Sequence, residues 1–171
     1  NWEKMESVTF FGGSFNPWHD GHRTCLDLCP EKNIVVIPDT NPFKEREEKG
    51  CFWSALKEIS LHLEETPYKV FPGFFGLERP NPTADWFLPL SFEKKGLLLG
   101  DDTFFQIGKW TNAIELMASI NHLYIVPRER SIKEIEKEVK RLNALYPHIL
   151  IRVLPEHIHQ GVSSTKLRKL R

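Results

Sequence analysis

The stretch "FFGGSFNPWHDGHRTC" (residues 10–25) joins an apolar run to a helical pattern through a turn rich in glycine and histidine. Gly12 and Gly13 carry no Cβ, so their backbone can approach phosphate oxygens closely. His19 and His22 are three residues apart, so both can face the same spot from the first turn of a helix. Free N–H groups and the helix dipole add positive potential at that spot. We therefore expect the turn to hold a triphosphate.

Short apolar runs alternate with helical patterns along the chain. The runs span residues 7–11, 33–38, 68–71, 96–100, 122–126 and 149–154. Their apolar character is continuous rather than alternating, which is typical of parallel strands buried on both faces. The helical patterns span residues 20–29, 51–65, 84–94, 112–119 and 131–146. In the last of these, Ser131 and Glu134 fit a capping box. The alternation predicts an α/β fold, a Rossmann-like doubly wound parallel sheet with helices on both faces.

The charge of the chain is balanced, with 23 acidic and 23 basic residues among 171. No net field therefore attracts a nucleic acid polymer or an anionic membrane, and a small anion needs a local site. No stretch approaches the roughly 18 apolar residues of a membrane span. The opening "NWEKMES" shows no signal-peptide core. We expect one domain over residues 1–171, with neither membrane nor nucleic acid polymer as a partner, and the sequence leaves a homo-oligomer open.

The three cysteines form an odd set without a disulfide spacing, which suits a reducing cytoplasm. Cys25 and Cys29 share a helical stripe with His19 and His22, and nitrogen with thiolate is a donor set for zinc. However, four ligands from a single helix rarely close a tetrahedron. We expect both cysteines to be small core residues, and we predict no metal ligands in the protein.

Two motifs at opposite ends of the chain resemble the signatures of one enzyme superfamily. "GGSFNPWHDGH" (12–22) is similar to the G-[ST]-F-[DN]-P-x-H-x-G-H turn of adenylyl- and cytidylyltransferases, and "GVSSTKLRKLR" (161–171) to their I-S-[ST]-T-x-x-R motif. Within this superfamily the chain most resembles bacterial nicotinate-nucleotide adenylyltransferases. The stretches that carry the narrower resemblance are "IPDTNPFK" (37–44), "ERPNPTADW" (78–86), "LLLGDDTFFQIGKW" (97–110) and "INHLYIVPRER" (120–130).

The resemblance implies transfer of the adenylyl group of ATP, accompanied by Mg²⁺, to nicotinate mononucleotide, as in NAD biosynthesis. The residues it implies for catalysis at the phosphates are His19, His22, Lys44 and Arg168. Those it implies for ATP binding are Gly12, Gly13, Ser14, Phe15, Gly21, Gly100, Asp102, Arg128, Ser163, Ser164 and Thr165. Those it implies for the acceptor are Asn16, Thr83 and Trp110. Residues 162–171 are expected to form a last helix that carries the second motif.

Several of these residues also fit a structural role. Asp102 can bind a ribose hydroxyl, help to hold Mg²⁺ or cap the helix that follows it. Trp110 can stack on a pyridine ring or pack in the core, and Arg128 can lie near adenine or on the surface. Lys44 can be a solvated loop residue, and residues 163–165 can be a simple N-cap. The residues alone leave these alternatives open.

The sequence determines the identity of the acceptor less closely than it determines the use of ATP. Pro82 and Trp86 stand where the family usually has Tyr and Thr, in a segment that holds the acceptor in the family. Nicotinamide mononucleotide or phosphopantetheine is therefore an alternative acceptor, and a non-catalytic nucleotide-binding module is an alternative function. The same segment, residues 71–86, is a candidate binding loop, and its aromatic residues Phe74, Phe75 and Trp86 fit either a lid or an interface.

Overall fold

The computed structural model describes residues 6–13, 20–38, 49–71 and 82–156, with the backbone alone for residues 49–55. The strands of this part are β1 (Ser7–Gly13), β2 (Ile34–Pro38), β3 (Lys69–Val70), β4 (Lys94–Gly100), β5 (His122–Val126) and β6 (Leu150–Val153). The helices are α1 (Asp20–Leu28), α2 (Lys49–Leu63), α3 (Thr83–Phe87), α4 (Asp101–Gln106), α5 (Ala113–Ser119) and α6 (Ile132–Leu145), with a 3₁₀ turn, η2 (Ile107–Lys109), after α4.

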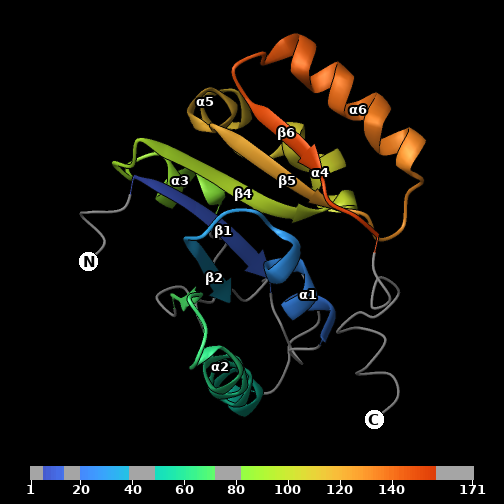
Figure 1. The fold of residues 1–171 in the computed structure, drawn as a ribbon. Helices are drawn as coiled ribbons and strands as arrows, with labels where there is room; N and C mark the ends of the chain where they lie inside the picture. Colours follow the sequence, from blue (N-terminus) through green and yellow to red (C-terminus); the bar gives the residue numbers. More distant parts are fainter. Residues whose placement is uncertain (1–5, 14–19, 39–48, 72–81, 157–171) are drawn as a thin grey trace.

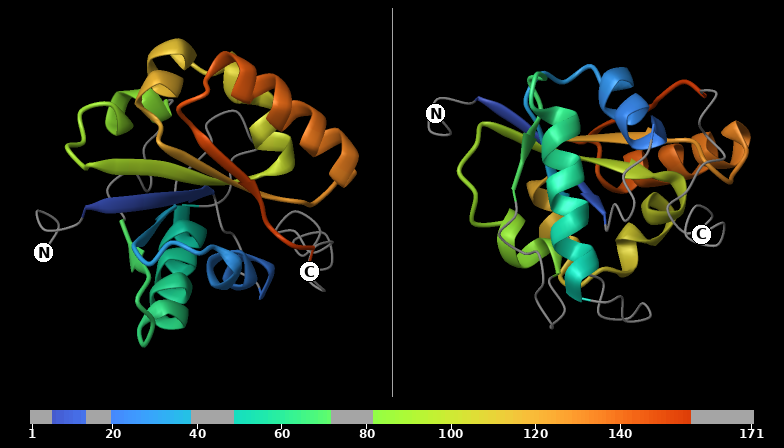
Figure 2. Two further views of the ribbon diagram at one scale, coloured as in Figure 1. Left: turned by 45° about the horizontal axis from the view of Figure 1, so that its top comes forward. Right: turned by 90° about the horizontal axis from the view of Figure 1, so that it is seen from below.

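The strands form one six-stranded sheet in the order β3-β2-β1-β4-β5-β6. Every strand pair in it is parallel. Helices cover both faces: α1 and α2 lie on one side of the sheet, and α3, α4, α5 and α6 lie on the other (Figures 1 and 2). This arrangement confirms the predicted Rossmann-like doubly wound fold.

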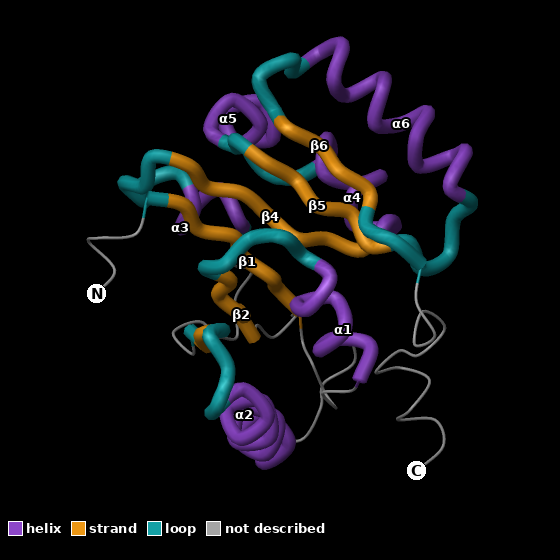
Figure 3. The backbone as a smooth tube through the Cα atoms, viewed as in Figure 1, coloured by secondary structure: helices purple, strands orange, loops and turns teal. Residues whose placement is uncertain are grey.

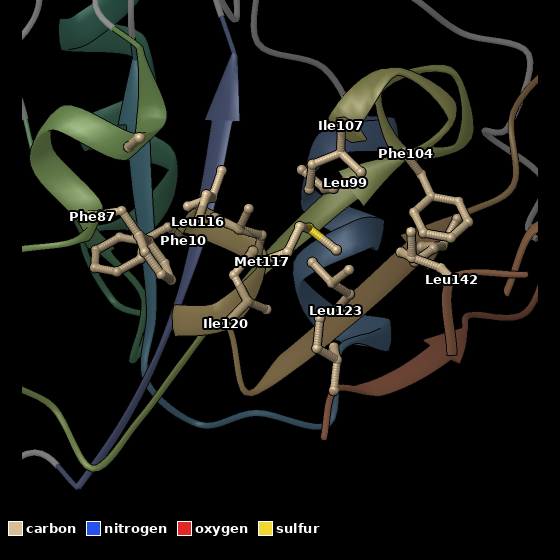
Figure 4. Close-up of a cluster of buried hydrophobic side chains, with 14 of the residues drawn as sticks. Phe10, Phe87, Leu99, Phe104, Ile107, Leu116, Met117, Ile120, Leu123 and Leu142 are labelled. Atoms are coloured by element: carbon tan, nitrogen blue, oxygen red, sulfur yellow. The ribbon is translucent and has the colours of Figure 1, made fainter. Parts of the chain in front are cut away.

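Two apolar clusters fill the space between the sheet and its helices. The larger one gathers the sheet face toward α3–α6, including Phe10, Leu99 and Leu123, together with Phe87 and Met117 from the helices (Figure 4). The smaller one joins the opposite face to α1 and α2 and contains Leu26, Ile59 and Leu98. Neighbouring residues of one strand thus enter different clusters, which is why the strand sequences are apolar without interruption.

The predicted strands are confirmed, whereas one predicted helix needs correction and one helix was not predicted. The pattern over 84–94 predicted one helix, but α3 ends at Phe87 and β4 already begins at Lys94. Pro89 has no N–H and cannot continue the helix. In addition, the Lys95 ammonium donates to the carbonyl oxygens of Phe87 at 2.7 Å, Leu88 at 3.1 Å and Leu90 at 3.0 Å, which satisfies the C-terminal end of α3.

The helix that the sequence pattern did not indicate is α4. It begins directly at the end of β4 with Asp101 and buries Phe104 in the larger cluster. Aspartate has low intrinsic helix propensity, but acidic residues in a first turn are favoured by the helix dipole. In Figure 3 this strand-to-helix transition takes place with almost no loop. Within the described residues, no helix combines the length and the apolar character needed to cross a membrane.

A buried hydrogen bond crosses the centre of the sheet. Thr9, Gly96 and His122 are in register on β1, β4 and β5. The His122 ring passes over Gly96, so its Nε2 reaches Thr9 Oγ1 at 2.7 Å. A methyl group at Gly96 would collide with the ring and carbonyl oxygen of His122. Burial lowers the pKa of His122 below its ordinary 6.5, opposed by the charge of Glu31 and assisted by that of Lys94.

We expect the free energy of unfolding to fall as the pH is lowered from 6.5 because His122 binds its proton more readily in the unfolded chain. Stability then rises with pH between the folded-state pKa and 6.5, by at most about 1.4 kcal/mol per pH unit. His122→Gln keeps an amide for Thr9 but cannot titrate, so its unfolding should depend less on pH. Urea unfolding of both proteins between pH 5 and 8 measures this, and parallel curves would contradict the assignment.

Candidate active site

Two glycines end neighbouring strands at the centre of the sheet. Phe11 of β1 pairs with Leu98 of β4, so Gly13 and Gly100, each two residues further on, end their strands at the same level. The chain leaves β1 toward α1 on one face and leaves β4 toward α4 on the other. Such a point opens a crevice at the carboxyl ends of the strands, and parallel α/β sheets bind nucleotides there.

The buried face of α1 brings His22 to this edge. Gly21 and His22 are buried with Cys25 and Leu26, one helical turn along the same face. The His22 ring meets the edge of the Phe11 ring at 6.3 Å between centroids, with an interplanar angle of 61°. Phe11 immediately precedes Gly12, so His22 lies beside the strand end that carries the glycine turn. Figure 1 shows α1 directly below this end of β1.

The segment after β5 contributes two arginines to the same edge. The Arg128 Cδ atom lies 3.2 Å from the point that a Cβ on Gly100 would occupy, so the side chain folds over this glycine. Its charge also acts on the Cys25 thiol: burial raises the pKa of Cys25 to about 11, and Arg128 opposes the rise. The positive charge of Arg128 therefore lies within electrostatic reach of α1, on the face that carries His22.

Asp102 takes part in a charged cluster rather than in a helix cap. Its carboxylate lies 3.4 Å from Arg130 Nε, and the Arg130 guanidinium stacks 3.9 Å above the Phe105 ring. A hydrogen bond with Asp102, followed by the repulsion of that carboxylate, raises the pKa of Glu129. The N-terminal end of α4 receives no side-chain cap from its preceding residue. Asp102 is half exposed at the sheet edge, where a ribose hydroxyl or a hydrated cation has access.

Asp101 is the residue of this region that the sequence analysis missed. Its side chain is fully buried, with Oδ1 accepting from Asp102 N at 2.8 Å. Oδ2 accepts from the backbone nitrogens of Arg128 at 2.9 Å, Glu129 at 2.8 Å and Arg130 at 2.8 Å. Burial raises the pKa of Asp101, but these backbone hydrogen bonds outweigh it and hold the pKa below its ordinary value. The sequence signal was an acidic residue placed directly at the end of an apolar strand.

Of the residues expected to hold the acceptor, Thr83 and Trp110 lie on the other face of the sheet, and Asn16 lies outside the described residues. Thr83 opens α3, and Trp110 follows η2 with its side chain half-buried against the larger apolar cluster. Trp86 is not part of a lid, because it lies in α3 and packs edge-on against Phe10 at 5.0 Å between ring centroids. The partial exposure of Trp110 is compatible with both alternatives, a core role and stacking.

Other predicted site residues lie outside the described residues, as does the expected helix 162–171. They are Ser14, Phe15, Asn16, His19, Lys44, Ser163, Ser164, Thr165 and Arg168. Among the residues that are described, no group of three or more His, Cys, Asp or Glu side chains is arranged to hold a metal ion. Cys25 and Cys29 pack in the smaller apolar cluster as free thiols.

Comparisons with known proteins give consistent results. The chain is 28% identical over 172 residues to a protein named "Probable nicotinate-nucleotide adenylyltransferase" from Caldicellulosiruptor bescii, a match that covers 95% of this chain and 85% of the relative. It is 31% identical over 132 residues to a protein of the same name from Helicobacter pylori strain 26695, covering 68% of this chain and 72% of the relative. No family model matches.

A solved structure described as "Putative Nicotinate-nucleotide Adenylyltransferase" from Vibrio parahaemolyticus shares the fold. Its TM-score is 0.51 at 16% identity, over 86% of this chain and 99% of that chain. The parallel sheet defines a Rossmann-like protein, and the curated relatives define its class as nucleotidyltransferase. At the identity and coverage of the Helicobacter pylori relative, the chain belongs to the nicotinate-nucleotide adenylyltransferase family.

We expect Cys25 and Cys29 to resist alkylation in the folded protein. Burial raises the pKa of each thiol to about 11, so at pH 8 only about one in a thousand is the reactive thiolate. Iodoacetamide labelling at pH 8, mapped by peptide mass spectrometry, measures this. Both cysteines should react fully in guanidinium chloride, and rapid labelling of either in the native protein would contradict their place in the core.

Proposed function

We propose that this protein transfers the adenylyl group of ATP to nicotinate mononucleotide in NAD biosynthesis. The acceptor phosphate oxygen forms a bond to the α-phosphorus, the bond from that phosphorus to the bridging oxygen breaks, and pyrophosphate leaves with the electron pair. The observation that carries this proposal is the convergence of Gly13, Gly100, His22 and Arg128 at the switch point of the sheet, in a chain of this family. No covalent bond to the protein is needed.

The chain's contribution to such a step is positioning and neutralisation of charge. We assign Gly12 and Gly13 to close approach of the triphosphate, which their lack of a Cβ permits. His22 would donate a hydrogen bond to a phosphate oxygen from the buried face of α1, and Arg128 would meet the nucleotide from above Gly100. Asp102, half exposed beside Arg130, would accept from a ribose hydroxyl.

The remaining assignments rest on the sequence motifs. We propose that His19 and Lys44 contact the phosphates and that residues 163–165 bind ATP together with Arg168. Gly21 would allow the backbone of α1 to approach ATP closely. The acceptor would contact Thr83 and Trp110. The proposed residues before α1 are Ser14, Phe15 and Asn16. We also propose that residues 1–171 form one nucleotidyltransferase domain.

Magnesium enters this proposal as part of the ATP substrate. Mg²⁺ keeps several waters and is commonly held by substrate phosphates with one or two carboxylates. Among the described carboxylates, the half-exposed Asp102 at the sheet edge could meet a hydrated cation carried by the nucleotide. We place the reaction in the cytoplasm, an inference supported by the free thiols of Cys25 and Cys29.

The proposal predicts release of pyrophosphate from ATP and Mg²⁺ only when a suitable acceptor is added. Nicotinate mononucleotide, nicotinamide mononucleotide and phosphopantetheine should be compared at equal concentration in a coupled pyrophosphate assay. Activity should be highest with nicotinate mononucleotide. A preference for another acceptor would overturn the substrate, and ATP binding without turnover on any acceptor would overturn the enzymatic function.

Replacement of His22 by alanine should lower kcat about 100-fold or more, because a donor to the transferring phosphates is lost from a partly desolvated site. His62→Ala is the matched control, since His62 is exposed near the C-terminal end of α2. Steady-state kinetics and urea unfolding should be measured on both variants. A folded His22→Ala protein that keeps near-normal turnover would refute the assignment.

A further inference from the structure

The carboxylate of Asp101 is a buried anion at the candidate nucleotide-binding edge described above. It is fully buried, and its contacts in the structure are four backbone N–H groups, one from Asp102 and three from residues 128–130. Three consecutive amides that point at a single oxygen form an anion-binding concavity. Asp101 fills this concavity, so a bound phosphate cannot use these amides.

A ligand can therefore contact only the side chains of residues 128–130. The hydrogen bonds to Asp101 hold the backbone from which these side chains extend. Arg128 leaves this segment and folds over Gly100, with its Cδ 3.2 Å from the Cβ position of that glycine. Gly100 and Asp101 are adjacent in sequence. One short stretch thus anchors the main chain of Arg128 through Asp101 and leaves room for its side chain at Gly100.

Without the Asp101 carboxylate, the backbone of residues 128–130 would no longer be held where the Arg128 side chain reaches over Gly100. The amides of residues 128–130 would need other partners, since leaving buried donors unsatisfied is costly. Only one further residue, Ser131, separates them from the start of α6, and its Oγ already accepts from Glu134 N at 3.2 Å. The segment is therefore held at both ends, by β5 and by the capped α6, and Asp101 sets its path between them.

We propose that Asp101 is a positioning residue for ATP: its buried carboxylate holds the backbone of residues 128–130 so that the Arg128 guanidinium meets the bound nucleotide. The inference rests on the proposed function for the identity of the nucleotide. Asp101 touches neither ATP nor the acceptor in this arrangement. The effect of Asp101 on the affinity for ATP therefore requires Arg128. A purely structural role for Asp101 would not require Arg128, so this dependence distinguishes the two roles.

A double-mutant cycle tests this dependence. The affinity for MgATP, without acceptor, is measured by isothermal titration calorimetry for the wild type, Asp101→Asn, Arg128→Ala and the double variant. We expect each single change to weaken MgATP about tenfold, the scale of one hydrogen bond to a charged group. The double variant should bind like Arg128→Ala alone. Arg141→Ala, on the exposed side of α6, is the control and should bind MgATP like the wild type.

Urea unfolding of the same four proteins supplies the readout for a structural role. The loss of stability from Asp101→Asn should be equal with and without Arg128, because the carboxylate binds backbone amides and not the guanidinium. If the asparagine variant does not fold, Asp101→Glu keeps the charge but shifts the carboxylate, and the same coupling to Arg128 is expected.

Additive losses of MgATP affinity in the double variant, or an Arg128→Ala protein that binds like the wild type, would overturn the inference. A wild-type protein that binds MgATP but does not use nicotinate mononucleotide would overturn the proposed reaction and leave this inference intact. A wild-type protein that binds no MgATP would overturn both.

Discussion

The parallel pairing of β1 with β4 is the constraint on which both the core and the candidate active site depend. The two strands are neighbours in the sheet, yet the chain leaves β1 toward one face and β4 toward the other. Their register brings Gly13 and Gly100 to the same level, without a Cβ on either side of the crevice. A slip of one residue would exchange the faces of every side chain in β1 and move the glycine turn away from Gly100. The two apolar clusters, which take alternate residues of β1, hold this register.

A buried carboxylate beside the proposed phosphate site looks unfavourable, because it places a negative charge where the proposal has an anion bind. Four amide donors spread and stabilise that charge, and they keep the pKa of Asp101 low even though burial raises it. Arg128 and Arg130 lie on the segment that the carboxylate anchors, and Arg130 also meets Asp102. Arginine side chains are therefore available to a ligand at this edge, whereas the carboxylate of Asp101 is buried and bound to backbone amides. This division explains how an acidic pair at the end of β4 is compatible with a polyphosphate.

The sequence predicts the central strands β1, β2, β4 and β5 well because each is a short apolar run buried on both faces, and the length of such a run between polar or turn-forming segments favours a strand over a helix. It fails where a polar residue is satisfied by tertiary contacts. Lys95 lies in β4 and is buried because its ammonium group donates to three carbonyl oxygens, that of Phe87 at the end of α3 and those of Leu88 and Leu90 just after it, so β4 begins earlier than its apolar run. At the candidate site, the motifs predict roles for the glycine turn, His22, Gly100 and Arg128, and these roles stay predictions. They predict none for Asp101, because its partners lie 27 to 29 positions further along the chain, on a segment whose position only the fold determines.

Polar residues have different roles at the two ends of the strands. Toward the amino ends they stabilise the fold, whereas at the carboxyl ends they are available to a ligand. In the amino-terminal half and the middle of the strands, polar side chains bind one another: Thr9 with His122 at 2.7 Å, and Tyr124 Oη, which donates to the partly buried Glu31 at 2.8 Å. Burial and the Glu31 hydrogen bond raise the pKa of Tyr124 well above its ordinary value, so it stays a neutral donor. At the carboxyl ends, the neighbouring strands β1 and β4 stop at glycines, and the charged side chains of residues 128 and 130 extend from a backbone that Asp101 anchors. A ligand at that edge can compete for arginines and exposed carboxylates without breaking a core hydrogen bond. The Thr9–His122 bond links β1 to β5 across Gly96 of β4, away from the strand ends that carry the candidate site, so a ligand can bind there while the register of these strands stays fixed.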